Sequence, residues 1–255
     1  MNRLAKLARY VVDFNHHRRF ADHMGAYRGV FRTMAEARAS APDAKIGFDF
    51  DESASLYDER IGKLFPSDYP AMFWLRECLR TARTVFDFGG HVGVSFYAYE
   101  KPLALDGDVR WTVCDMPKIT SRGRVLAAVN GATNLSFCER FSECERYEVL
   151  LCSGSLHYLE PSLAELLAPL AKRPHHLVLN KLPLTSGSPF VTLQNTVHSF
   201  NPYKVQNREA LLRGLTNLGY DVVDAWENAD MACHIPLHRD RTVARYSGFY
   251  LRARA

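Results

Sequence analysis

The fold of this chain is indicated most clearly by the stretch TVFDFGGHVGVSFY, residues 84–97. A short apolar run, typical of a buried strand, ends on Asp87, and Gly89, Gly90 and Gly93 follow before an apolar pattern of helical spacing. Glycine in a strand-to-helix turn lets a ligand approach the backbone closely, because no Cβ stands in the way. The helix after it offers unpaired N–H groups and the positive end of its dipole. The stretch therefore predicts a cofactor site of the kind that dinucleotides and S-adenosylmethionine use.

The spacing of the glycines distinguishes these two cofactors. The dinucleotide fingerprint G-x-G-x-x-G, started at Gly89, needs glycine at positions 91 and 94, which are His91 and Val94. The pattern acid-x-G-x-G-x-G fits at Asp87, Gly89 and Gly93, with His91 in place of the middle glycine. This partial match favours S-adenosylmethionine over a dinucleotide.

A second acidic residue follows at the end of the next apolar run, WTVCDMP. Asp115 stands there, 26 residues after Gly89. A carboxylate at this place in a nucleotide-binding sheet can accept hydrogen bonds from both ribose hydroxyls. Met116 beside it is apolar and polarizable, which suits contact with an adenine face. The alternative is that Asp115 serves only the turn before Pro117.

Two regions of different rhythm divide the chain. Residues 1–82 are mostly helical in pattern, including YRGVFRTMAEARASA and YPAMFWLRECLRTA, and are predicted to form a helical cap. Residues 83–255 alternate short apolar runs with longer helical patterns, which is typical of a parallel sheet covered on both faces. The last two runs, YDVVDAWE and RYSGFYLRAR, lack a helix between them and predict an antiparallel pair at the sheet edge. The expected architecture is a Rossmann-like α/β domain whose ligand lies beyond the carboxyl ends of the strands.

Four blocks in order resemble a bacterial family of class I S-adenosylmethionine-dependent methyltransferases. They are VFDFGGHVGVSFY, WTVCDMP, YEVLLCSGSLHYL and LNKLPLTSGSPFVTLQ, matching a D-F-G-G-x-x-G turn, an acid-x-P, an S-G-x-L-x-Y block and a late T-x-Q. The likeness runs from about residue 25 to the end of the chain. It implies the seven-stranded methyltransferase sheet and a site for S-adenosylmethionine, but no particular methyl acceptor.

The resemblance also implies roles for individual residues in holding the cofactor. Asp87, Gly89, Gly90 and Gly93 would surround its methionine part, and Asp115 would take the ribose. In addition, Phe141 would lie near the adenine and Ser153 close to the sulfonium.

The candidate catalytic residues come later in the chain. His157 in SGSLHYL follows the fourth strand and has a side chain suited to proton transfer near neutrality. The alternative is a histidine that packs or caps the next helix. Tyr158 could donate a hydrogen bond to a substrate or fill the core.

Gln194 lies in the long polar stretch 183–205, which we expect to be a functional loop. Gln194, Asn195, His198 and Tyr203 could face the acceptor from this loop. The N-terminal aromatics could close a lid or belong to the cap's core: Phe48, Phe50, Tyr57, Tyr69 and Trp74.

Composition narrows the class of protein. The 255 residues include 47% hydrophobic and 24% charged residues, an ordinary globular balance, and the formal net charge is only +4. Because no basic face is concentrated and no N-P-P-Y tetrad occurs, nucleic acid is not an expected partner.

The six cysteines form no C-x-x-C pair, so we expect buried free thiols rather than a disulfide framework or a metal site. No stretch is long enough for a membrane span or a signal peptide, which favours a cytoplasmic protein. A homodimer stays open.

Three functions remain compatible with these patterns. The leading one is a methyltransferase that acts on a small molecule, in natural-product or cell-surface biosynthesis. The second keeps the fold and the cofactor, but the sealed cofactor cyclises to azetidine-2-carboxylate and methylthioadenosine. The third is a domain that binds S-adenosylmethionine as a non-catalytic partner.

Overall fold

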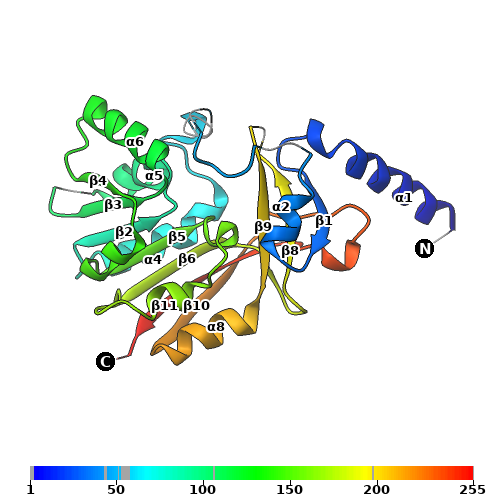
Figure 1. Ribbon diagram of the computed structural model, residues 1–255. Coiled ribbons are helices and arrows are strands. Elements are labelled where there is room, and N and C mark those ends of the chain that lie inside the picture. The colour runs from blue at the N-terminus through cyan, green and yellow to red at the C-terminus, as the bar shows by residue number, and fades with distance from the viewer. Residues whose placement is uncertain are drawn as a thin grey trace.

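The computed structural model describes residues 3–42, 45–50, 52, 58–105, 107–196 and 198–254. Its centre is a seven-stranded sheet with the order β10-β11-β6-β5-β2-β3-β4 (Figure 1). Strand β11 runs antiparallel to both its neighbours, and the other pairs are parallel. This confirms the Rossmann-like sheet with its antiparallel edge pair. The strands are β2 (Thr84–Phe88), β3 (Arg110–Cys114), β4 (Leu135–Cys138), β5 (Val149–Ser153), β6 (His176–Leu182), β10 (Tyr220–Asn228) and β11 (Tyr246–Ala253).

Helices cover both faces of this sheet, as a parallel sheet requires. One face packs against α4 (Tyr69–Cys78), α5 (Val94–Leu103) and α6 (Pro117–Asn130). The other packs against α7 (Leu163–Leu167) and α8 (Arg208–Asn217). The apolar runs of β2 and β5 are buried between these layers, which explains why they read as continuous rather than alternating. All six cysteines are buried free thiols, as expected.

A second, smaller sheet lies beside the first one and was not predicted. Its order is β1-β8-β9-β7, with β1 (Tyr27–Phe31), β7 (Leu184–Thr185), β8 (Phe190–Asn195) and β9 (Phe200–Asn207). Figure 1 shows it between the main sheet and the N-terminal helix. Two expectations are corrected here. Most of the stretch 183–205 is a hairpin rather than an open loop, and the first part of YRGVFRTMAEARASA is a strand, followed by the short helix α2 (Met34–Ala39).

One local and one distant feature explain why residues 27–31 form the strand β1 and not a helix. Gly29 adopts a φ of +76°, which interrupts a helix, and Tyr27 pairs with Gln194 in the antiparallel ladder to β8. Helical spacing of the apolar residues was therefore overridden by a tertiary pairing. The N-terminal segment thus combines helices with a strand, and the division into domains at residue 82 stays a prediction.

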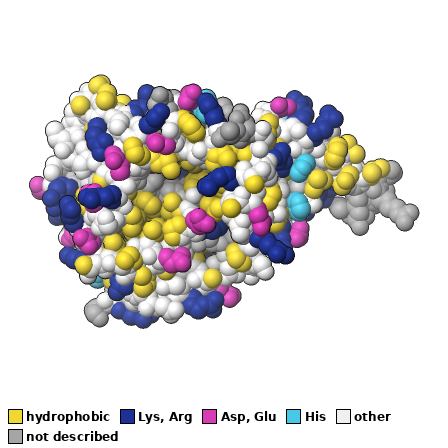
Figure 2. Space-filling view, in the orientation of Figure 1, with side chains coloured by type: hydrophobic (Ala, Val, Ile, Leu, Met, Phe, Trp, Pro, Cys, Tyr) yellow, Lys and Arg dark blue, Asp and Glu magenta, His cyan; other side chains and the backbone are white. Residues whose placement is uncertain are grey.

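The N-terminal helix α1 (Arg3–Arg18) projects from the body (Figure 1). It is held by Asp13, which is buried and accepts a hydrogen bond from the Nε of Arg239 at 2.8 Å. Its outward side exposes apolar residues, and hydrophobic side chains are visible on it in Figure 2. Among the described residues, no helix combines the length and the apolar character needed to cross a membrane.

Candidate functional site

The glycine turn between β2 and α5 forms one wall of the site. Gly89 has a φ of +74°, and a Cβ there would collide with the side chain of Ser155, whose hydroxyl donates a hydrogen bond of 2.6 Å to the carbonyl of Phe88. A Cβ on Gly90 would collide with the carboxylate of Asp87. The turn therefore depends on both glycines, and it presents bare backbone where a ligand can approach.

Asp87 lies beneath this turn rather than in the open. It is buried, and the indole Nε1 of Trp111 donates to its Oδ2 at 3.2 Å, while Oδ1 has no hydrogen-bond partner among the described residues. Burial raises the pKa of Asp87 to about 7, with the charge of Asp115 adding to the rise and Trp111 and Lys181 opposing it. A cation bound above the turn would therefore find a carboxylate with an unsatisfied oxygen close by.

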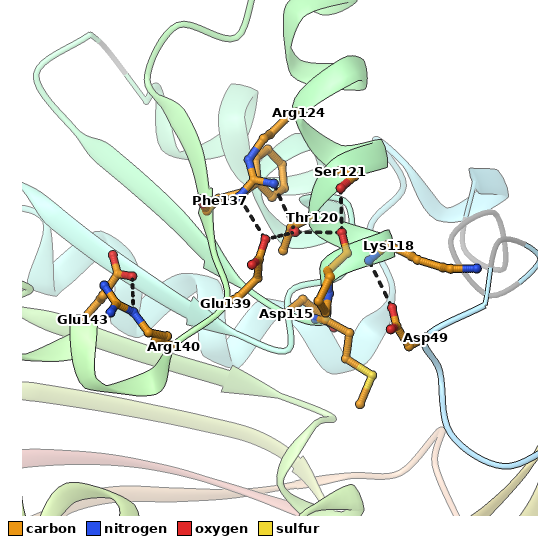
Figure 3. Close-up of polar contacts among 12 residues, drawn as sticks. Asp49, Asp115, Lys118, Thr120, Ser121, Arg124, Phe137, Glu139, Arg140 and Glu143 are labelled. Carbon is orange, nitrogen blue, oxygen red and sulfur yellow. Dashed lines mark hydrogen bonds and ion pairs between the residues drawn. The ribbon is translucent and has the colours of Figure 1, made fainter.

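Asp115 is tied to the glycine turn through the backbone. Its Oδ2 accepts the N–H of His91 at 2.9 Å and its Oδ1 accepts the N–H of Met116 at 2.8 Å. Burial raises the pKa of Asp115 to about 6, against these two hydrogen bonds, and the nearby Asp49 adds to the rise. Asp49 itself accepts the N–H of Lys118 at 3.0 Å at the start of α6 (Figure 3). The N-terminal segment thus reaches over to the edge where Asp115 lies.

Phe141 lies after β4 on the same edge, packed against Phe88 with a ring-centre distance of 4.8 Å. Near it, Glu139 accepts hydrogen bonds from Thr120 at 2.8 Å and from Arg124 at 3.2 Å (Figure 3). Met116, directly before the first residue of α6, is 43% exposed. The edge has the mixed apolar and polar character that an adenine needs, but the adenine assignment of Phe141 stays a prediction.

A cavity of about 470 Å³ begins at the glycine turn and extends toward the second sheet. Several of the predicted site residues line it: Gly89, Gly90, Ser153, His157, Tyr158 and Gln194. The others are not among its described lining residues and lie behind or beside the turn: Asp87, Gly93, Asp115, Met116 and Phe141. The structure therefore brings the predicted catalytic residues together with the glycine turn, while the two acids support the turn from outside the cavity.

His157 lines the cavity and also packs against neighbouring rings. It therefore combines the exposure to a ligand expected of a catalytic residue with the packing expected of a structural one. Its ring lies 4.1 Å from that of Tyr203 and 4.3 Å from that of Tyr158, between ring centres. The Nδ1 atom is buried without a partner among the described residues. Burial lowers the pKa of His157 to about 3, and no charged neighbour contributes to this shift. The imidazole is therefore neutral throughout the physiological range.

A chain of hydrogen bonds connects the predicted Tyr158, Gln194 and Tyr203 to Tyr27 and Tyr246, which the sequence did not reveal. The hydroxyl of Tyr158 donates to Oε1 of Gln194 at 2.6 Å, and Nε2 of Gln194 donates to the hydroxyl of Tyr27 at 3.0 Å. Tyr27 is bonded to Tyr246 at 3.0 Å, and Tyr203 donates to Tyr246 at 2.7 Å. We call these four tyrosines and Gln194 the tyrosine belt. All five line the cavity.

An ion pair on the opposite wall was also missed by the sequence analysis. Lys181 Nζ lies 2.6 Å from Oδ1 of Asp68, which also accepts the hydroxyl of Tyr99 at 3.1 Å. Lys181, the next-to-last residue of β6, has a φ of +57°, an uncommon conformation for a residue with a side chain. Next to it, the fully buried Asn180 donates to the carbonyl of Ser67 at 2.8 Å. The one available signal was that Lys181 lies in the block LNKLPLTSGSPFVTLQ, one of the four that carry the family resemblance.

The proposed lid aromatics divide into different environments. Phe48 packs edge-to-face against Tyr158 at 4.8 Å and so adjoins the belt, whereas Trp74 stacks on Tyr250 at 4.2 Å within the core. Tyr69 is 56% exposed, and Phe50 lies under the ammonium of Lys45. Tyr57 lies outside the described residues. Of the residues expected in the acceptor loop, Asn195 and Tyr203 line the cavity, while His198 is exposed and does not.

Solved structures share this fold at low sequence identity. The 1,6-didemethyltoxoflavin-N1-methyltransferase of Burkholderia thailandensis, with its substrate and S-adenosylhomocysteine bound, has a TM-score of 0.52 at 20% identity over 80% of this chain and 86% of its own. The glycopeptide N-methyltransferase MtfA, complexed with S-adenosyl-L-methionine, has a TM-score of 0.52 at 11% identity over 74% and 94%. An S-adenosylmethionine-dependent methyltransferase of Clostridium acetobutylicum has a TM-score of 0.51 at 10% identity over 80% and 99%. No protein-family model matches the chain, and comparison with curated protein sequences finds no match. The similarity establishes the Rossmann-like methyltransferase fold.

Proposed function

We propose that this protein is an S-adenosylmethionine-dependent methyltransferase that acts on a small molecule. The observation that carries the proposal is the link between the glycine turn and Asp115, in which the second-strand carboxylate accepts the backbone N–H of His91 within the turn. This link holds the two elements that a nucleoside cofactor needs at one edge of the sheet. The shared fold with methyltransferases that bind this cofactor or its product supports the same conclusion.

The residues of the site fit the cofactor. Gly89 and Gly90 leave backbone where side chains would collide, and the unpartnered oxygen of Asp87 lies under the same turn. These three and Gly93 would hold the methionine part, and Asp115 would accept the ribose hydroxyls. The adenine would lie beside Met116 and Phe141, and Ser153 on the cavity wall would adjoin the sulfonium.

When bound, S-adenosylmethionine supplies a methyl group on an already activated sulfonium, so the protein's task is to align the acceptor and to exclude water. Tyr158 and Gln194 would orient the acceptor through the hydrogen bonds of the belt. His157 is neutral and could accept a hydrogen bond or a proton from the nucleophile. Its low pKa makes it a weak base, which suits an acceptor whose proton leaves during or after methyl transfer rather than before it.

The natural-product chemistry of two structural neighbours supports a small-molecule acceptor from such a pathway. Cyclisation of the cofactor itself and binding without reaction use the same cofactor residues. The continuation of the cavity from the glycine turn to the tyrosine belt favours methyl transfer over both, because it gives a second molecule a place to bind.

The proposal is tested by two measurements on the purified protein. Calorimetric titration with S-adenosylhomocysteine should show binding to a single site. Incubation with S-adenosylmethionine alone, followed by mass spectrometry, should leave the cofactor intact. Methylthioadenosine with a cyclic amino acid would identify the cyclase instead, and a protein that binds neither compound would contradict the cofactor assignment.

A further inference from the structure

We propose that the half of the cavity lined by the tyrosine belt and His157, the acceptor half, takes an uncharged, planar molecule that presents a polar ring group, such as a carbonyl or a ring nitrogen, to the belt. This inference rests on the proposed function and names the substrate class of the same site. It is carried by the charge, the hydrogen-bond balance and the ring geometry of the belt and of His157.

The belt is electrically neutral. Burial raises the pKa values of Tyr27, Tyr203 and Tyr246, and the neighbours that perturb them are other tyrosines and Cys233, not carboxylates or basic groups. His157 is neutral for the same reason of burial. A charged group placed among these side chains would lose its hydration without gaining a counter-ion, which is unfavourable.

The charged side chains that line the cavity lie elsewhere. Lys181 and Asp68 form the ion pair on the opposite wall and compensate each other. Arg60, Lys63 and Asp230 are exposed and belong to the rim. The interior of the acceptor half therefore selects against net charge, while the rim can still attract a charged substituent that remains in water.

The hydroxyls of the belt bond mainly to one another. Tyr158 donates to Gln194, and Tyr203 donates to Tyr246. Tyr27 bonds to Tyr246 and also to Tyr203, so the hydroxyls of these three tyrosines form a closed set in which each can donate once. A phenol hydroxyl can both donate and accept, and all three line the cavity, so the set can reorient to give a hydrogen bond to a polar atom of a bound molecule.

The walls around these hydroxyls are aromatic. The ring of Tyr203 packs edge-to-face against Tyr27 at 5.0 Å and against Tyr158 at 5.4 Å, and the ring of His157 lies 4.1 Å from it. A planar ring can add to such a cluster in the offset or edge-to-face arrangement that aromatic groups prefer. Flexible or globular acceptors would bury less area against these faces.

Three matched probes test the proposal by calorimetric titration at pH 7.5, with the protein saturated with S-adenosylhomocysteine. They share one bicyclic ring: 2-naphthamide is neutral, 2-naphthoate is an anion of nearly the same shape, and 2-naphthylmethylammonium is a cation. We expect 2-naphthamide to bind at least ~10-fold more tightly than either charged probe, a difference of about 1.4 kcal/mol.

The variants Tyr27→Phe and Tyr246→Phe should each weaken 2-naphthamide about 5-fold without changing the affinity for S-adenosylhomocysteine. Tyr220→Phe is the matched control, because its buried hydroxyl bonds to Pro174 outside the cavity, and it should leave the probe's affinity unchanged.

Four results would overturn the inference. The anion could bind as tightly as the amide. The cation could bind more tightly than the amide, which would indicate an aromatic cage for a positive charge. The amide could fail to bind while S-adenosylhomocysteine binds, or both belt variants could retain the wild-type affinity for the amide. The order of the wild-type protein's affinities for the three probes tests the inference even if a variant does not fold. Loss of S-adenosylhomocysteine binding by the wild-type protein would instead contradict the proposed function, and the inference with it.

Discussion

At the glycine turn the wall of the cavity consists of bare backbone supported by carboxylates, whereas at the second sheet it consists of phenol, amide and imidazole side chains. Asp87 and Asp115 have raised pKa values and stand behind the turn, outside the cavity. The tyrosine belt faces the cavity directly and carries no charge. One half is thus suited to a charged cofactor of fixed shape, and the other to a neutral acceptor. Four substitutions can sharpen or break this contrast.

The largest effect is expected from Asp115→Ala. If Asp115 accepts the ribose hydroxyls, as we propose, its loss should weaken the binding of S-adenosylhomocysteine about 100-fold, because each hydrogen bond to a charged group contributes about 1.5–3 kcal/mol. Calorimetric titration measures the affinity, and circular dichroism checks that the fold is retained. Asp49→Ala is a nearby control, since its carboxylate bonds to the backbone of Lys118, and it should change the affinity much less. Unchanged binding by Asp115→Ala would remove the ribose assignment.

Gly90→Ala should act on the turn itself. The new Cβ meets the buried carboxylate of Asp87, so we expect a loss of about 2 kcal/mol in the free energy of unfolding, as for other overpacked sites. Chemical denaturation measures this change. Gly107→Ala is the control, because a Cβ there meets no atom within 4 Å, and it should be close to neutral. An equal change in unfolding free energy for the two substitutions would show that the turn can accommodate a Cβ at position 90.

Asp87→Asn should stabilise the protein at neutral and alkaline pH. The pKa of Asp87 is about 7 in the folded protein and about 4 in an unfolded chain. The folded state therefore holds the proton more tightly, so stability is lost as pH rises from about 4 to about 7 and the penalty is complete above that. Asparagine does not titrate, and its advantage in Tm should grow from near zero at pH 4.5 to a few degrees at pH 8.

Thermal unfolding over this pH range checks the prediction. A difference in Tm that does not vary with pH would show that Asp87 is not the titrating group. If the methionine part of the cofactor lies above the turn, Asp87→Asn should also weaken the binding of S-adenosylmethionine. The loss in binding free energy should then exceed the change in the free energy of unfolding.

Tyr158→Phe should give the smallest effect and act on the other half of the cavity. It removes the donor to Gln194 Oε1 and should cost about 1 kcal/mol of stability, while the affinity for S-adenosylhomocysteine stays within a factor of two. Chemical denaturation and titration measure the two quantities. A marked loss of cofactor affinity would contradict the separation of the two halves.

The contrast between the glycine turn and the tyrosine belt also explains which parts of the fold and of the candidate site were predictable from sequence. Asp87, Gly89 and Asp115 lie on consecutive strands and turns, so local patterns and spacing identified both the main sheet and the candidate cofactor residues. Tyr27 and Gln194 are separated by 167 residues, and nothing near Tyr27 indicates its partner. Lys181 and Asp68 pair across 113 residues in the same way. Local periodicity carries no information on such distant pairings, and in YRGVF it indicated a helix.

The pairing of β1 with β8 has a consequence for the synthesis of the protein. Tyr27 leaves the ribosome long before Gln194, because the chain must grow by 167 residues from one to the other, which takes roughly 8–30 s at about 5–20 residues per second. During that interval the strand has no partner, while β2 to β5 can already pair among themselves. The acceptor half is therefore completed last, and a nascent chain with a finished cofactor half still carries an open strand edge that a chaperone or another nascent chain can occupy.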